Sequence, residues 1–242
     1  MSSLPNTLSP PIDFQSSVQS LLSFLFSREK TRPTKNRSPD RTAAEPLFEL
    51  VEHAGNDRAE VERFISQRFS ESFGSRVESF MPRLFSLRSE DGAIHGAFGL
   101  RSANRRLFLE QYLDTPIDKA IAARTGNKVE RRVVVEVGHF SGTFPGAVRA
   151  MICLLTERLH HEGFEWVTFT GTTHLRNAFH RMGLSPIDMQ AAEIERLPKE
   201  EHAVWGHYYE HAPRVLVGNI GEGYRALSAR AAQPATRIGR AA

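Results

Sequence analysis

Apolar positions in the middle of the chain follow two different periods, and the alternation between them outlines a set of strands and helices. Short runs rich in β-branched and aromatic residues predict strands, whereas apolar residues spaced three and four apart predict amphipathic helices. The Asp91–Gly92 pair separates two of the short runs and predicts a β-hairpin. The predicted strands cover 47–52, 83–89, 93–102, 107–113, 133–140 and 166–170.

Four helices are predicted among these strands, and a glycine follows each of them. Asp57 is placed to cap the first helix, and Thr115 with Asp118 forms a capping box at the second. The third helix covers roughly 147–161, and Thr172 or Thr173 caps the fourth. The glycines that end the helices are Gly74, Gly126, Gly163 and Gly183.

The order of these elements predicts the fold class and the extent of the domain. Strands cluster early and a strand–helix–strand–helix unit comes late, which indicates one α/β domain of layered α+β character over residues 46–222. Residues 1–45 are rich in Ser, Pro and Arg, and residues 223–242 are basic and Ala-rich, so both are predicted to be disordered or weakly structured. The apolar stretch 18–26 would form either a short helical turn or an amphipathic contact with a membrane or a partner.

Composition narrows the functional classes only slightly. The 242 residues are 40% apolar and 24% charged, and the net charge is +3, which is poor support for a nucleic-acid site. The single cysteine allows no intrachain disulfide. No apolar run reaches the roughly 18–20 residues of a membrane span, and residues 18–26 lack the order of parts of a secretory signal. We therefore expect a cytoplasmic protein.

Two glutamates stand among apolar residues of predicted strands. In "VVVEVGHF", Glu136 shares a strand face with Val134, and in "LFLEQYL", Glu110 shares a face with Phe108 and Tyr112. A lone carboxylate is costly in an apolar setting, so each is paired, protonated or used. Either side chain would serve as a general base with a raised pKa or as a structural acceptor for an arginine, and the sequence leaves both interpretations open.

A candidate anion site follows the strand that carries Glu136. The helix that begins near "PGAVR" (145–149) would present free backbone N–H groups and the positive end of its dipole. Gly146 and Ala147 have almost no side chain, so a phosphate would approach the backbone closely there, beside Val148. The alternative is a plain strand–turn–helix connection in which proline and glycine only make the turn.

The histidines and the cysteine are better explained by structural roles. His160 and His161 end a helix, where a cation suits the dipole. His207 and His211 are four residues apart, but no third ligand stands at metal-site spacing, so no metal is predicted. Cys153 falls within an apolar helix and is expected to be a packed thiol.

Several segments together resemble the thermostable hemolysin family, from about Phe48 to Ile220. That family resembles the GNAT acyltransferase fold and, within it, the acyl-homoserine-lactone synthases. The resemblance implies a mixed, splayed central sheet flanked by helices, with an acyl-thioester cleft beside the strand of Glu136. The segments that carry it are "LFLEQYLDTPI" (107–117), "VEVG" (135–138), "PGAVR" (145–149), "GFEWVTFTGTTHLRNAFHRMGL" (163–184) and "WGHYYEHAPRVLVGNI" (205–220).

The resemblance also implies roles for individual residues. Backbone N–H groups around Gly138, His139 and Phe140 would contact the thioester, and Asn177 would face the cofactor arm. Tyr208 or Tyr209 would protonate the departing thiolate. The chain departs from the GNAT pattern at "SGTFPGA" (141–147), where no basic residue or Gln leads the phosphate loop.

These implications lead to one functional expectation and one rival. The expected protein is an acyltransferase that moves an acyl group from acyl-CoA or an acyl-carrier protein to a small-molecule amine or hydroxyl, with Glu136 or Glu110 as the base. The departure in the phosphate loop keeps the carrier protein open as acyl donor. The rival is a non-catalytic GNAT-like domain that binds a partner or a membrane, with any hemolysin activity indirect.

Overall fold

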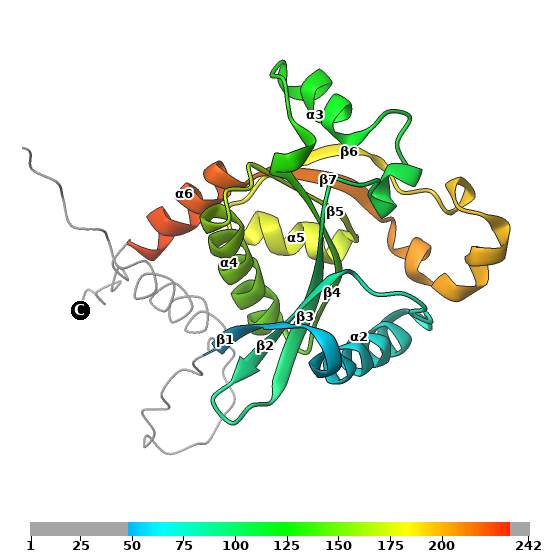
Figure 1. Cartoon of the computed structure of the whole chain (residues 1–242), viewed down its shortest axis with the longest axis vertical. Helices are drawn as coiled ribbons and strands as arrows, with labels where there is room; N and C mark the ends of the chain where they lie inside the picture. The colour runs from blue at the N-terminus through cyan, green and yellow to red at the C-terminus, as the bar shows by residue number, and fades with distance from the viewer. Residues whose placement is uncertain (1–47, 233–242) are drawn as a thin grey trace, which may run out of the picture.

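The computed structural model describes residues 48–232, and a seven-stranded sheet runs through the middle of them (Figure 1). The strand order is β1-β2-β3-β4-β5-β7-β6, with β4 and β5 parallel and the other neighbouring pairs antiparallel. The strands are β1 (Phe48–His53), β2 (Arg83–Ser89), β3 (Ile94–Ser102), β4 (Val134–Gly142), β5 (Trp166–Gly171), β6 (Ile187–Ala191) and β7 (Arg214–Asn219). The helices are α2 (Arg58–Phe73), α3 (Ile117–Thr125), α4 (Pro145–His161), α5 (Thr173–Arg181) and α6 (Ile220–Ala231), and the 3-10 segments are η2 (Gly55–Asp57), η3 (Phe108–Gln111), η4 (Arg131–Val133), η5 (Ile194–Arg196), η6 (Lys199–Trp205) and η7 (Tyr208–His211).

Glycines set two of the predicted boundaries through their backbone conformation. Gly92 turns the chain between β2 and β3 with φ at 82°, and Gly74 ends α2 with φ at 65° while donating its N–H to the Ser70 carbonyl at 2.9 Å. Glycine adopts this left-handed region without the steric penalty that a side chain brings. The hairpin and the end of the first helix are confirmed.

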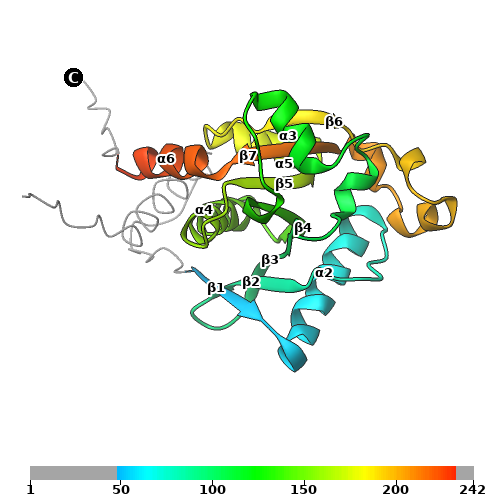
Figure 2. The ribbon, with the colours of Figure 1, turned by 45° about the horizontal axis from the view of Figure 1, so that its top comes forward.

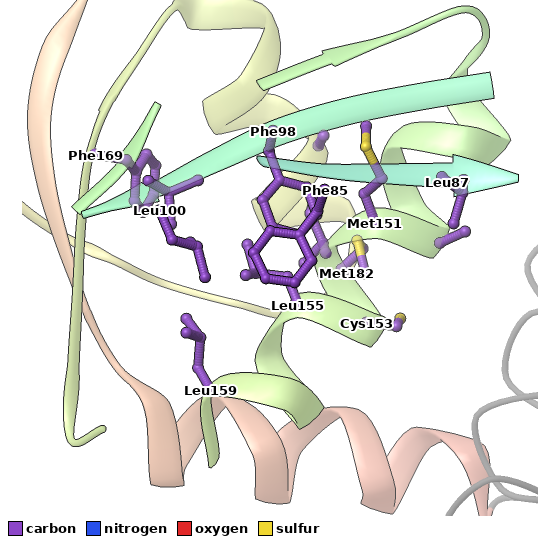
Figure 3. Close-up of a cluster of buried hydrophobic side chains, with 14 of the residues drawn as sticks. Phe85, Leu87, Phe98, Leu100, Met151, Cys153, Leu155, Leu159, Phe169 and Met182 are labelled. Atoms are coloured by element: carbon purple, nitrogen blue, oxygen red, sulfur yellow. The ribbon is translucent and has the colours of Figure 1, made fainter. Parts of the chain in front are cut away.

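Helices cover both faces of the sheet and bury separate apolar clusters. On one face, α4 packs across the strands and against α6, and α5 packs on β5 (Figures 1 and 2). Side chains of β2 and β3 meet those of α4 there, with Phe85 and Phe98 stacked at a centroid distance of 5.1 Å (Figure 3). On the other face, α2 covers β2 and β3, and η3 and α3 cover Val134 and β7. Neighbouring residues of a strand point to opposite faces, so a shift of one residue in the strand pairing would exchange the side chains that are buried on the two faces. Burial on both faces therefore fixes the register of the sheet.

Two sequence predictions near Glu110 are wrong. Residues 107–113 form the 3-10 segment η3 rather than a strand, because Glu110 and Glu136 hold the backbone N–H groups of this segment. The next helix begins after Pro116, without a side-chain cap from Thr115. The predicted capping box is therefore absent from this helix.

The C-terminal boundary predicted at residue 222 is also wrong. α6 continues to Ala231, Asn219 caps it by accepting the Glu222 N–H at 2.9 Å, and Leu227 is buried against α4. The strands β6 and β7 lie in a segment for which no helix or strand is predicted from the sequence. The predictions for residues 1–45, including the apolar stretch 18–26, lie outside the described residues.

Among residues 48–232, no helix is both long and apolar enough to cross a membrane.

Candidate active site at the split between β4 and β5

The two halves of the sheet separate along one pair of parallel strands. β4 and β5 pair from Val134 with Trp166 to Val137 with Phe169. Beyond these positions β4 runs on to Gly142 beside β3, and β5 runs on to Gly171 beside β7. The pairing therefore stops halfway along β4, and the strands diverge from there.

A cavity of about 1280 Å³ occupies this split and reaches both faces of the sheet. The side on the α4 face is apolar, whereas Glu136, Arg101, Tyr112 and Tyr208 line the opposite side. A cavity of this size accommodates a small-molecule ligand with a long apolar part. The apolar residues on the α4 face include Val137, Phe140, Val148, Ile152, Leu155, Phe169, Leu175 and Phe179.

Glu136 is a buried carboxylate at the edge of this cavity, with 3% of its surface exposed. Its two oxygens accept backbone N–H groups of η3, from Leu109 at 2.9 Å and from Phe108 at 3.1 Å. Burial raises the pKa of Glu136 above its ordinary value, although the two hydrogen bonds and the positive charge of Arg101 act in the opposite direction. The side chain is thus held in place, and its pKa is shifted in the direction that general-base catalysis near neutral pH requires.

Glu110 has the contacts of a structural acceptor. Its carboxylate accepts the backbone N–H groups of Leu107 and Ile117, each at 2.8 Å, and pairs with Arg131 at 2.6 Å. Burial alone would raise the pKa of Glu110, but the hydrogen bonds from Arg131 and from the backbone outweigh burial, so this pKa is lowered. Glu110 lines a separate small hollow next to α3 and does not line the main cavity.

The two candidate tyrosines differ in their access to the cavity. Tyr208 lines it, and burial raises the pKa of its phenol, which stays protonated. Tyr209 does not line it, and its hydroxyl bonds the hydroxyl of Tyr112 at 2.6 Å. Burial raises the pKa of Tyr209 to about 12. Tyr112, which lines the cavity, was not among the predicted site residues.

A bulge in β4 places the predicted thioester contacts at the split. The β3–β4 register jumps from Gly99 with Gly138 to Ala97 with Ser141, so β4 carries an extra residue, which a bulge leaves out of the ladder. His139 lies in the bulge with φ at 56°, an uncommon value for a residue with a side chain. Gly138, His139 and Phe140 all line the cavity.

The ring of His139 is fixed and neutral. Burial, together with the smaller effect of the positive charge of Arg101, lowers its pKa to about 4. The ring nitrogen Nε2 accepts the backbone N–H of Met81 at 3.2 Å. His139 therefore connects β4 to the segment that follows α2.

The predicted anion site at the start of α4 is only partly exposed to the cavity. Val148 and Pro145 line it, whereas Gly146 and Ala147 are buried and do not. Arg68 of α2 reaches this loop, donating from Nη2 to the Gly142 carbonyl at 3.2 Å. The structure thus brings a guanidinium to a loop whose own sequence has no basic residue.

The remaining candidates lie away from the cavity or have structural contacts. Asn177 is exposed on α5 and does not line the cavity. His207 forms a hydrogen bond with Glu210 at 2.8 Å, and His211, which lines the cavity, packs its ring edge-on against Phe73 at a centroid distance of 5.3 Å. The described residues hold no group of side chains able to bind a metal ion. Cys153 is a packed thiol of α4, and burial raises its pKa to about 12.

The split sheet, with its parallel β4–β5 pair and flanking helices, defines a GNAT-like fold. Solved structures of 10–17% identity share it, each with a TM-score of 0.50. TofI in an apo form is 17% identical over 74% of this chain and 95% of that chain. FeeM, an N-acyl amino acid synthase from uncultured soil microbes, is 10% identical over 74% and 93%. BjaI with MTA, a CoA-dependent acyl-homoserine lactone synthase, is 14% identical over 78% and 92%.

The sequence also matches a defined protein family. The profile of the family described as thermostable hemolysin matches residues 51–224, and the chain belongs to this family. No curated protein matches the sequence. The resemblance drawn from the motifs is therefore confirmed at the level of the family and of the fold.

Proposed function

We propose that this protein is an acyltransferase that moves an acyl group from a thioester, on CoA or on an acyl-carrier protein, to a small-molecule amine or hydroxyl. One observation carries the proposal. The cavity at the β4–β5 split joins a buried, oriented carboxylate on one face of the sheet to an apolar chamber on the other. An acyl chain fits the chamber by its chemistry, and its thioester would then lie at the bulge beside Glu136.

In the reaction with an amine, residues that line the cavity carry out the proton transfers. The amine nitrogen attacks the thioester carbonyl carbon, an amide bond forms, and the carbon–sulfur bond breaks. Glu136 accepts the proton that the nitrogen loses, and Tyr208 gives a proton to the leaving thiolate. Backbone N–H groups at the bulge around His139 stabilise the negative charge that develops on the carbonyl oxygen.

The start of α4 would hold the phosphate of the acyl donor. Both CoA and a carrier protein present a phosphate on the pantetheine arm, and a helix N-terminus with a nearby guanidinium favours such an anion. Arg68 supplies that guanidinium from α2, although it also pairs with Glu71 at 2.6 Å. The names of FeeM, an N-acyl amino acid synthase, and of BjaI, a CoA-dependent acyl-homoserine lactone synthase, agree with the proposed acyl transfer.

Ligand-induced stabilisation tests the proposal directly. Decanoyl-CoA and decanoyl-carrier protein are each added to the full chain, and the melting temperature is compared with that in free CoA and in decanoate. A ligand at a hundred times its dissociation constant adds about 2.7 kcal/mol to the stability of the folded state. Absence of any shift, together with no loss of thioester in the presence of mixed amines and alcohols, would favour the non-catalytic rival.

The apolar chamber is expected to select among acyl donors by the length of the acyl chain. A Cβ at Gly223 of α6 would lie 3.6 Å from Thr156 and 3.9 Å from Leu184, and these residues line the cavity. Gly223→Leu should therefore fill part of the chamber and lower kcat/KM for decanoyl-CoA relative to butanoyl-CoA by about tenfold or more. Ala229→Leu, at an exposed position of the same helix, is the control and should leave the ratio unchanged. An unchanged ratio in Gly223→Leu would place the acyl chain elsewhere.

A further inference from the structure

Arg101 lies directly beside Glu136 in the sheet. The two residues are paired across β3 and β4, so their side chains project from the same face, with Cβ atoms about 4.5–5.5 Å apart. Both line the cavity. The positive charge of Arg101 favours the ionised form of Glu136 and the neutral form of His139.

This guanidinium has no protein partner within the described part of the chain. No ion pair within 4.0 Å and no side-chain hydrogen bond involves Arg101 there, and the Glu136 oxygens accept only the N–H groups of Phe108 and Leu109. The other arginines of the cavity are both paired, Arg68 with Glu71 at 2.6 Å and Arg76 with Glu78 at 2.7 Å. Arg101 thus presents its hydrogen-bond donors to the cavity at the position of the proposed base.

We propose that Arg101 binds a carboxylate of the acyl acceptor, and that the acceptor is an α-amino acid. This inference rests on the proposed function and adds the substrate class. A guanidinium fork matches a carboxylate in two parallel hydrogen bonds. In an α-amino acid the amine and the carboxylate are bonded to the same carbon, so a carboxylate on Arg101 brings the amine toward the adjacent Glu136. The product is an N-acyl amino acid, and the carboxylate itself takes no part in bond making.

A purely structural role for Arg101 makes a different prediction. If the guanidinium only offsets the buried charge of Glu136, its removal would slow the reaction of every acceptor equally. A carboxylate site instead discriminates between acceptors that carry the charge and acceptors that lack it. The ratio between these acceptors separates the two roles, because a change in the pKa of Glu136 cancels from the ratio.

The experiment supplies decanoyl-CoA with a mixture of proteinogenic amino acids or with the matching mixture of their amides, which keep the amine and lose the charge. Wild type should acylate the acids faster by about 10- to 100-fold, the worth of a charge-assisted hydrogen bond. Arg101→Met should bring the ratio near one, and Arg101→Lys should retain part of it. Arg106→Met removes an exposed arginine that does not line the main cavity and should leave the ratio as in wild type.

A second measurement does not depend on turnover. N-decanoyl amino acids should raise the melting temperature of wild type and not of Arg101→Met. The corresponding N-decanoyl amino acid amides, which lack the carboxylate, should raise it in neither protein. This carboxylate-dependent protection without any acyl transfer would support the anion site and overturn the proposed function. Equal acylation of acids and amides by wild type would overturn the carboxylate site while acyl transfer stands. If Arg101→Met fails to fold, the ratio of acid to amide acylation in wild type and in Arg101→Lys tests the carboxylate site instead. If wild type shows neither acyl transfer nor carboxylate-dependent protection, both proposals are overturned.

Discussion

Replacing Glu136 by glutamine is expected to lower turnover by about 10²–10⁴-fold, the usual worth of a general base. The variant keeps the shape of the side chain and removes its capacity to accept a proton. The fold should survive, with a modest loss of about 1–3 kcal/mol, because the glutamine amide cannot accept both N–H groups of η3. Steady-state kinetics with decanoyl-CoA and urea denaturation measure the two effects separately.

The pH dependence of the reaction also tests the assignment of Glu136 as the general base. Burial raises the pKa of Glu136, and only the ionised carboxylate accepts a proton, so kcat/KM should rise with pH through a value above the ordinary glutamate value of 4.5. Arg101→Met removes a nearby positive charge that favours the ionised form. The acidic limb of the profile should therefore move to higher pH in Arg101→Met and disappear in Glu136→Gln.

Glu110→Gln is the matched control for Glu136→Gln, because both remove one charge from a carboxylate that holds η3. Turnover per folded molecule should change little in Glu110→Gln, since Glu110 does not line the main cavity. An unchanged rate in Glu136→Gln would eliminate Glu136 as the base. A large loss of rate in Glu110→Gln at full folding would move that role to Glu110.

The sequence predicts most of the fold because local pattern and turn chemistry agree along most of the chain. The helices between Asp57 and Gly183, and the strands of the β2–β3 hairpin, follow from period and from glycine positions. The prediction fails for 107–113, where a run of apolar residues resembles a strand. Its conformation depends instead on two carboxylates, one of them Glu136 from a strand far along the chain.

The site could be predicted only in part, because its decisive contacts join distant segments. The apolar settings of Glu136 and Glu110 look alike in the sequence, and the structure distinguishes them by the ion pair of Glu110 with Arg131 and by the main cavity, which only Glu136 lines. Nothing in the sequence around Arg101 indicates a function, apart from its place on a predicted strand. Its role becomes visible only in the structure, where strand pairing sets it opposite Glu136. Arg68 reaches the α4 loop from a helix more than seventy residues earlier, which no spacing rule anticipates.

Replacing Glu110 by glutamine is expected to destabilise the fold by about 3 kcal/mol, because the variant breaks the ion pair with Arg131 and leaves Asp118, at 3.2 Å, as the carboxylate partner of that arginine. The Glu110 side chain is 7% exposed and that of Arg131 is 29% exposed, which places the effect at the low end of such losses. The variant also leaves the N–H groups of Leu107 and Ile117 with a poorer acceptor. Urea denaturation of the full chain near neutral pH measures the difference.

The sign of the pH effect follows from the direction of the pKa shift. The pKa of Glu110 is lowered in the folded protein, so its stabilising contribution is fully present above the ordinary glutamate value of 4.5 and is lost as the pH falls through the lower folded value. The stability difference between wild type and Glu110→Gln should shrink over that acidic range. Glu130→Gln, which removes an exposed partner of Arg132, is the control and should leave the urea midpoint unchanged. Equal midpoints for wild type and Glu110→Gln near neutral pH would show that the Arg131 pair does not hold η3 and α3 in place.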